Sequence, residues 1–173
     1  MPRKLKNEEL DRKSVEEFKE SEKIPVIVIL DNVRSSNNTG SVFRTCDAFL
    51  VEKICLCGIT STPPNKDIHK TALGAEDSVS WQYYKNTEDA VRELKNAGYL
   101  IISVEQTEES IPLQDFRKNP KHKYALVFGH EVKGVSQGIV DISDYCIEIP
   151  QFGTKHSFNI TVSVGIVLWE LLG

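Results

Sequence analysis

The sequence predicts an α/β fold, in which a mostly parallel sheet has helices on both faces. Residues 24–30 form a continuous apolar run, the pattern of a strand that is buried on both sides as in a parallel sheet. Segments with helical periodicity alternate with further short apolar runs along the chain. The 173 residues fit one domain of ordinary size, and no repeat or linker divides them.

The N-terminal segment, residues 1–21, is expected to be helical and to precede the main domain, residues 22–173. Residues 7–20 have a weak amphipathic periodicity, with Asn7 as the expected N-cap and Leu10 and Phe18 as apolar anchors. The apolar run at 24–30 then begins the main domain as its first strand.

A polar loop at residues 31–38 leads to a helix that the periodicity predicts over residues 39–50. Its apolar positions have the spacing of a helix that lies on a sheet: Val42, Phe43, Cys46, Phe49 and Leu50. A second helix is predicted over residues 87–97, capped by Thr87 and ended by Gly98. The remaining strands are predicted at residues 53–57, 79–83, 99–104, 124–128 and 145–149.

The last predicted helix, residues 159–172, is apolar almost all the way round its axis. Such a helix must be covered on more than one side. The pattern is equally compatible with a second subunit as the extra cover and with burial inside its own domain. If the cover is a second subunit, a charge at Val164 or Leu168 is expected to break the dimer.

Composition and charge narrow the class of protein. With 40% hydrophobic and 27% charged residues the chain is typical of a globular protein, and no apolar run is long enough to span a membrane. No secretory signal is visible at the N-terminus, and the four cysteines lack CxxC spacing, so reduced, buried thiols in a cytoplasmic protein are expected. The cysteines are Cys46, Cys55, Cys57 and Cys146.

The formal net charge of −4 argues mildly against a protein that coats nucleic acid non-specifically. Two local basic groups remain possible contact surfaces, and solvated loops are the alternative interpretation of both. The first comprises Arg34, Lys66, His69 and Lys70, and the second comprises Arg117, Lys118, Lys121, His122 and Lys123.

Open α/β sheets bind ligands beyond the carboxyl ends of their strands, where three loops carry distinctive polar residues. In the first loop, Asn38 stands where an N-cap is expected, and Gly40 lies four positions before Arg44. Helical side chains lean toward the N-terminus, so Arg44 is expected to reach across Gly40 and form an anion site. The alternative is that Arg44 is a surface residue and Asn38 only a cap.

The second and third loops follow later strands. Residues 128–136 contain Gly129 and His130 but match neither GxGxxG nor a P-loop, and His130 has no partner for a triad or a metal site. Residues 149–159 join the last strand to the apolar helix, with Ser157 or Asn159 as its expected cap. An ordinary connection is the alternative for this third loop.

Together the three loops resemble the SpoU, or TrmH-type, 2′-O-ribose RNA methyltransferases of the SPOUT superfamily. The first motif of that family is an Asn followed six positions later by an Arg, here Asn38 and Arg44. The second is Gly-x-Glu-x-x-Gly leading to an Ile-Pro pair, here residues 129–134 and 149–150. The third is Ser-Leu-Asn opening a helix, here residues 157–159. The resemblance extends over roughly residues 24–172.

The resemblance implies a C-terminal trefoil knot, the SPOUT fold, and a homodimer in which a second subunit covers the last helix. It implies S-adenosyl-L-methionine as cofactor, with S-adenosyl-L-homocysteine as product, and no metal or membrane partner. The residues expected to line the cofactor pocket are Gly129, Ile149 and Phe158, with the stretch from Val104 to Thr107 as a weaker candidate. Phe158 replaces the usual leucine and Gln151 the frequent methionine, which affects packing at the expected adenine pocket.

For catalysis, the resemblance places Arg44 beside the ribose hydroxyl and a phosphate. Because a guanidinium does not readily lose its proton, stabilising the developing alkoxide is a simpler role for Arg44 than acting as a base. Asn38, Glu131, Ser157 and Asn159 are expected to orient Arg44, the ribose and the cofactor.

The expected substrate is RNA, with tRNA favoured over rRNA, contacted by patches near Arg34, Arg44, Lys66 and Lys70. Two alternatives stay open: a catalytically silent RNA-binding protein on the same fold, and a methyltransferase that acts on a base or a small molecule.

Overall fold

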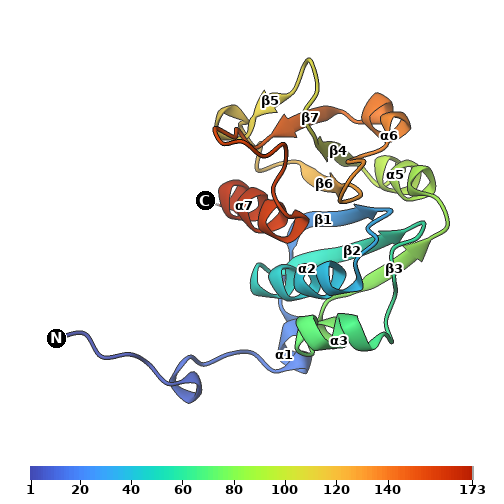
Figure 1. Ribbon diagram of the computed structural model, residues 1–173. Coiled ribbons are helices and arrows are strands. Elements are labelled where there is room, and N and C mark those ends of the chain that lie inside the picture. Colours follow the sequence, from blue (N-terminus) through green and yellow to red (C-terminus); the bar gives the residue numbers. More distant parts are fainter. Residues whose placement is uncertain (173) are drawn as a thin grey trace.

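The computed structural model describes residues 1–172, which fold around one parallel sheet (Figure 1). Seven strands pair in the order β3-β2-β1-β6-β4-β7-β5, and every pairing is parallel. The predicted parallel sheet is therefore confirmed. The strands are β1 (Ile24–Asp31), β2 (Val51–Cys57), β3 (Trp81–Tyr84), β4 (Tyr99–Val104), β5 (Ile111–Pro112), β6 (Lys123–Phe128) and β7 (Tyr145–Glu148).

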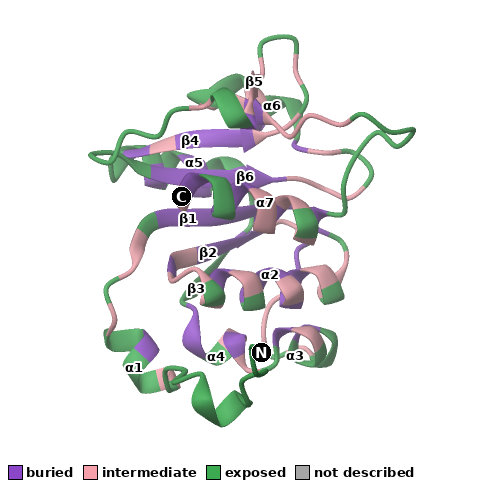
Figure 2. Ribbon diagram, turned by 90° about the vertical axis from the view of Figure 1, so that its left-hand side faces the viewer, coloured by how far each residue is buried: buried purple, intermediate pink, exposed green. Residues whose placement is uncertain are grey.

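Helices cover both faces of the sheet, as predicted. Strand β1 sends Val28 and Leu30 into the core on one face and Ile27 and Ile29 into the core on the other. The inner strands β1, β2, β4 and β6 are accordingly mostly buried, whereas the edge strand β3 is largely exposed (Figure 2). The first face carries α1 (Val15–Glu20), α2 (Ser36–Ala48), α3 (Lys66–Ala72), α4 (Ala75–Ser78) and α7 (Ile160–Leu172). The second face carries α5 (Thr87–Asn96) and α6 (Gln137–Ile142).

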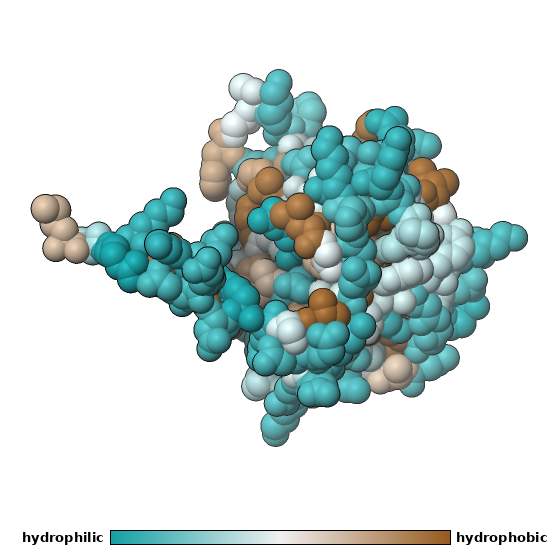
Figure 3. Space-filling model, turned by 90° about the horizontal axis from the view of Figure 1, so that it is seen from below, coloured by the Kyte–Doolittle hydropathy of each residue, from teal (hydrophilic) through white to brown (hydrophobic). Residues whose placement is uncertain are grey.

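The continuous helix predicted over residues 7–20 is wrong. A single 3-10 turn, η1 (Asn7–Glu9), is separated from α1, whose N-cap is Ser14 rather than Asn7. Of the two expected anchors, Phe18 is buried and Leu10 is exposed, because η1 belongs to an arm that stands away from the body of the molecule (Figure 3).

Helix α2 begins three residues before its predicted start. Ser35 is the N-cap, and its hydroxyl accepts a hydrogen bond from the backbone N–H of Asn38 at 3.2 Å. Asn38 therefore lies in the first turn, which leaves its side chain free for other partners. At α5 the cap position is likewise Asn86 rather than Thr87, and the Thr87 hydroxyl donates to the buried carboxylate of Asp31 at 2.6 Å.

The final helix is covered by its own domain on the side that was expected to face a partner. Val164 and Leu168 have no exposed surface, whereas Val162 and Trp169 are 46% and 72% exposed. The expectation that a charge at Val164 or Leu168 tests a dimer contact is therefore wrong, because such a charge would be placed in the core. The apolar pattern all round the helix does not reveal which side faces the sheet. The trefoil knot stays a prediction.

Three short elements were not predicted: α3, α4 and α6, of seven, four and six residues. The short 3-10 helix η2 (Leu113–Asp115) and β5 also lie in a stretch that was left without structure. Among the helices of residues 1–172, none combines the length and apolar character that a membrane span requires.

Candidate active site

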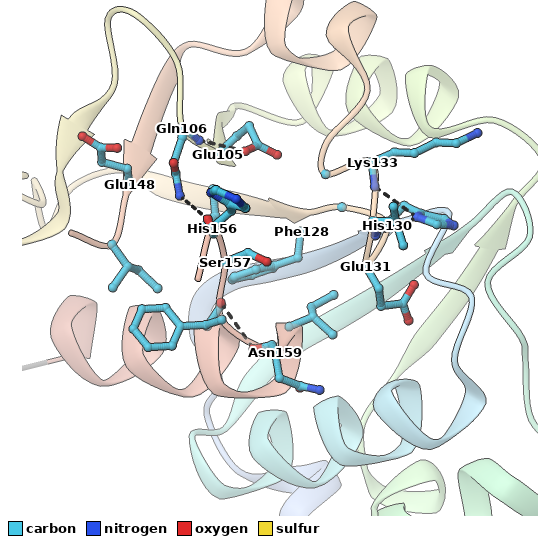
Figure 4. A pocket seen from close by; sticks show the side chains of 18 of the residues that line it. Glu105, Gln106, Phe128, His130, Glu131, Lys133, Glu148, His156, Ser157 and Asn159 are labelled. Atoms are coloured by element: carbon cyan, nitrogen blue, oxygen red, sulfur yellow. Dashed lines mark hydrogen bonds between the residues drawn. The ribbon is translucent and has the colours of Figure 1, made fainter. Parts of the chain in front are cut away.

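A cavity of about 510 Å³ opens at the carboxyl ends of β4, β6 and β7 (Figure 4). Its walls come from three loops that each follow one of these strands. The lining residues are 104–106 from the first loop, 128–134 from the second, and 148, 149, 151 and 156–160 from the third. Ser163 of α7 also lines the cavity. Because parallel strands end at the same edge of a sheet, segments far apart in sequence meet here.

Most of the predicted site residues line this cavity. All four residues expected at the cofactor do so, namely Gly129, Ile149, Phe158 and Val104. Of the five residues expected in catalysis, three do so, namely Glu131, Ser157 and Asn159. Asn38 does not line the cavity but is hydrogen-bonded to Glu131 and Asn159, and Arg44 is not one of the lining residues of this subunit.

Glu131 connects the second loop to the start of α2. Its carboxylate accepts the backbone N–H groups of Arg34 at 3.0 Å and Ser35 at 2.9 Å, and the side-chain amide of Asn38 at 3.1 Å. Partial burial favours the neutral acid, but the N–H donors from Ser35 and Arg34 outweigh it and hold the pKa of Glu131 below its ordinary value. Glu131 is therefore an ionised anchor that fixes the position of the Asn38 helix turn.

Asn159 continues this connection into the third loop. Its side-chain amide donates to the Asn38 side-chain oxygen at 3.5 Å, and its own oxygen accepts the backbone N–H of Thr161 at 2.8 Å. Asn159 rather than Ser157 therefore caps α7. The chain Glu131–Asn38–Asn159 links all three motifs, and in Figure 4 Glu131 and Asn159 face each other across one end of the cavity.

Gly40 has a different role from the one predicted. A Cβ atom at this position would lie 2.1 Å from the Thr71 hydroxyl and 2.3 Å from the carbonyl oxygen of Ile68. Gly40 therefore allows α2 and α3 to pack closely, and it does not provide a bare path for Arg44. Arg44 is an exposed residue of α2.

The second loop is a tight turn that packs on itself. A Cβ atom at Gly129 would lie 2.0 Å from the carbonyl carbon of Gly134, which itself has a φ of +68°. His130 exchanges both backbone hydrogen bonds with Gly134, and its Nδ1 accepts the N–H of Val132 at 3.0 Å. His130 thus stabilises the turn, a role that a lone histidine in a loop sequence does not reveal.

Two further wall residues lie in the stretch after β4 that was the weaker candidate, and their individual roles were not predicted. Glu105 accepts the N–H of Val135 at 2.8 Å, and Gln106 donates to the carbonyl oxygen of His156 at 2.9 Å. These contacts tie the loop after β4 to the other two loops, as the sticks in Figure 4 show for Gln106 and His156. Their position directly after the inner strand β4 could have identified them, because ligands in open sheets bind beyond the carboxyl ends of the strands.

The described residues contain no group of three or more His, Cys, Asp or Glu placed to hold a metal ion.

A parallel sheet whose strand-following loops enclose one cavity and are joined by Glu131, Asn38 and Asn159 is typical of open-sheet α/β proteins that bind a small molecule. The chain belongs to the SpoU rRNA Methylase family, whose profile matches residues 25–169.

Named relatives agree with this assignment. The chain is 32% identical over 162 residues to a tRNA (guanosine(18)-2′-O)-methyltransferase of Aquifex aeolicus, covering 91% of this chain and 74% of the relative. It is 33% identical over 146 residues to a 23S rRNA (guanosine-2′-O-)-methyltransferase of Neisseria meningitidis, covering 84% of this chain but 57% of that relative.

Solved structures show the same fold. The TrmH/SpoU tRNA modifying enzyme of A. aeolicus matches with a TM-score of 0.79 at 30% identity, over 91% of this chain and 78% of that one. An AdoMet-bound rRNA methyltransferase of Sinorhizobium meliloti matches with a TM-score of 0.78 at 27% identity, over 84% of this chain and 55% of that one.

Proposed function

We propose that the protein is an S-adenosylmethionine-dependent RNA 2′-O-ribose methyltransferase. The observation that carries the proposal is the cavity in which all three sequence motifs meet, joined by the Glu131–Asn38–Asn159 hydrogen bonds. The relatives named as tRNA and rRNA 2′-O-methyltransferases support it, as does the AdoMet-bound structure of a family member.

The cavity residues fit the cofactor. A volume of about 510 Å³ lies within the range of small-molecule sites, roughly 300–1,000 Å³. Ile149 and Phe158 offer apolar surface to an adenine ring, while the polar turn at residues 129–134 offers backbone groups. When bound, S-adenosylmethionine supplies a methyl group on a sulfonium, which is already a reactive electrophile.

The remaining task of the chain is to align a ribose hydroxyl and to stabilise the charge that develops on its oxygen. Ser157 and Asn159 lie in the cavity wall, and the role proposed for them is to orient the ribose. Because a guanidinium does not readily lose its proton, the role proposed for Arg44 is to stabilise the alkoxide.

A homodimer explains how Arg44 takes part. Helices α7 and α2 are neighbours on one face of the sheet, and α7 leaves Val162 and Trp169 exposed. A second copy that covers these apolar side chains lies beside the helix that carries Arg44. In this arrangement Arg44 of the partner subunit enters the cavity, which each subunit leaves open on its own.

The proposed substrate is tRNA rather than rRNA, because the relatives from A. aeolicus, Borreliella burgdorferi and Thermus thermophilus are all named as tRNA (guanosine(18)-2′-O)-methyltransferases. A cytoplasmic location is proposed from the cysteines. All four are free thiols, as is usual for proteins of a reducing compartment.

Transfer of a labelled methyl group to total RNA from a strain lacking the gene, followed by nucleoside analysis, tests the function. Label in 2′-O-methylated nucleosides is the expected result. Label on bases would instead show a base methyltransferase. Cofactor binding by calorimetry without any transfer would show a silent RNA-binding protein.

A further inference from the structure

A second cavity, of about 610 Å³, lies beside the edge strand β3 and shares no lining residue with the first. One wall is the segment 63–66 that leads into α3. The others are His69 on α3, Glu76 and Asp77 on α4, and Trp81 on β3. This cavity combines the indole ring of Trp81, the amine of Lys66 and the buried carboxylate of Glu76. The function proposed for the first cavity gives these three residues no role.

Trp81 offers an aromatic surface at this cavity. Its side chain is 36% exposed, although it stands at the start of a strand that pairs with β2. Exposed aromatic side chains beside basic residues are the usual stacking platforms for unpaired bases of nucleic acids.

Glu76 supplies an acceptor that lacks a donor. Its side chain is only 8% exposed, and one carboxylate oxygen pairs with His69 Nδ1 at 2.5 Å. The other oxygen, Oε2, is buried and has no hydrogen-bond partner among residues 1–172. An unsatisfied buried acceptor is unfavourable, so a ligand that brings an N–H group to this wall is stabilised.

Lys66 adds a cation at the rim of the same cavity. It is exposed and forms no ion pair with any carboxylate of the described chain. A ligand that fits this cavity thus has an aromatic ring for Trp81, an N–H donor for Glu76 and an anionic group for Lys66. A nucleotide whose base carries an amino group has all three.

The residues just before the wall segment 63–66 are hydrogen-bonded to the segment that leads into α2. The Ser61 hydroxyl accepts from the Ser36 hydroxyl at 2.8 Å, and Thr60 Oγ1 accepts the N–H of Val33 at 2.9 Å. Ser36 is the first residue of α2, the helix that carries Asn38. If one RNA strand contacts both cavities, the exposed Arg34, two residues before Ser36, is available to its phosphates.

We propose that the second cavity binds an unpaired nucleotide of the RNA substrate outside the methylated position, with its base on Trp81 and its phosphate at Lys66. This inference rests on the proposed function for RNA as the substrate. Because the nucleotide is remote from the reacting atoms, its loss should weaken RNA binding and leave the chemical step unchanged.

The first test separates KM from kcat in methyl transfer to total RNA. Trp81→Ala is expected to raise the KM for RNA about tenfold, in line with a stacking contribution of about 1–3 kcal/mol per base. The kcat and the Kd for S-adenosylmethionine should stay within about twofold. Trp81→Phe should restore most of the affinity, and Lys66→Ala should raise KM while the exposed control Lys85→Ala does not.

The second test does not depend on methyl transfer. A fluorescein-labelled, single-stranded 10-nucleotide RNA of mixed sequence is titrated with wild type and Trp81→Ala, each first shown to unfold at the same temperature. Weaker binding by Trp81→Ala supports the cavity even if the wild type transfers no methyl group. Equal binding by both proteins, or binding of a lysine-rich peptide in place of RNA at Trp81, would overturn the inference.

Discussion

Arg44 is the residue on which the proposed chemistry depends most. Arg44→Ala is expected to keep the fold and the affinity for S-adenosylmethionine, because Arg44 is exposed and does not line the cavity of its own subunit. The methyl transfer rate should fall by about 10²–10³, the usual effect of removing one group that stabilises an oxyanion. Calorimetry and transfer assays on the same preparation check both parts. Near-wild-type turnover would refute the role.

Glu131 is predicted to contribute to stability as well as to the site. Glu131→Gln replaces a carboxylate that accepts three N–H groups, two of them backbone N–H groups, with an amide that has one acceptor oxygen. The free energy of unfolding at neutral pH should fall by about 1–3 kcal/mol, because one donor loses its partner. The matched control is Glu108→Gln at an exposed position, which should change little.

The pH dependence of this difference follows from the lowered pKa of Glu131. A carboxyl group whose pKa is lower in the folded state contributes stability above its unfolded pKa and loses it as the pH falls. The gap between wild type and Glu131→Gln should therefore be full at neutral pH and shrink below about pH 4.3, the ordinary glutamate value. Urea unfolding at several pH values measures it, and a gap that widens in acid contradicts the assignment.

Residue roles were predictable from sequence only in part. Glu131, Ser157 and Asn159 were predicted correctly as cavity residues. Their sequence motifs lie in the loops that follow β6 and β7, and these loops form the cavity wall. The prediction that the Arg44 side chain reaches across Gly40 was wrong. A helical pattern shows which residues share a face of α2, but it does not show that α3 packs against that face at Gly40. The contact of Glu105 was not predicted because its partner, the N–H of Val135, lies thirty residues away in the sequence.

Among elements, the contact between α2 and α3 gives a sharp prediction. Gly40→Ala places a methyl group about 2 Å from Thr71 and the Ile68 carbonyl. The two helices must move apart, which should lower the free energy of unfolding by about 1–3 kcal/mol, as overpacking usually does. Gly138→Ala in α6 is the control, since its Cβ would meet only the Glu88 carboxylate at 3.8 Å. A Gly40→Ala protein as stable as the control variant would contradict this packing.

Long elements were predictable and short ones were not. The buried strand β1 and the helices α2, α5 and α7 were found because apolar periodicity accumulates over several turns or a long run. The helices α3, α4 and α6 have at most seven residues, so their stability comes from packing rather than from a local pattern. The continuous helix predicted over residues 7–20 does not form. Its residues favour a helix locally, but most of them are polar and do not pack against the core.

For the whole molecule, the proposed homodimer predicts different results for two faces of α7. Trp169→Glu changes an exposed side chain, so it should give a folded monomer with little methyl transfer activity. Val164→Asp places an unpaired charge in the core, so it should destabilise the subunit itself by about 3–5 kcal/mol. Analytical ultracentrifugation and thermal unfolding separate the two outcomes. A Trp169→Glu protein that still sediments as a dimer would exclude this helix face as the interface.

The position of the transferred methyl group tests the central claim most directly. Purified protein is incubated with tritiated S-adenosylmethionine and total RNA from a deletion strain, and the RNA is then hydrolysed in alkali. A methyl group on the 2′-oxygen blocks cleavage of the adjacent phosphodiester, so the account predicts label in alkali-resistant dinucleotides. Label in mononucleotides, or RNA without label from protein that binds the cofactor, would contradict it.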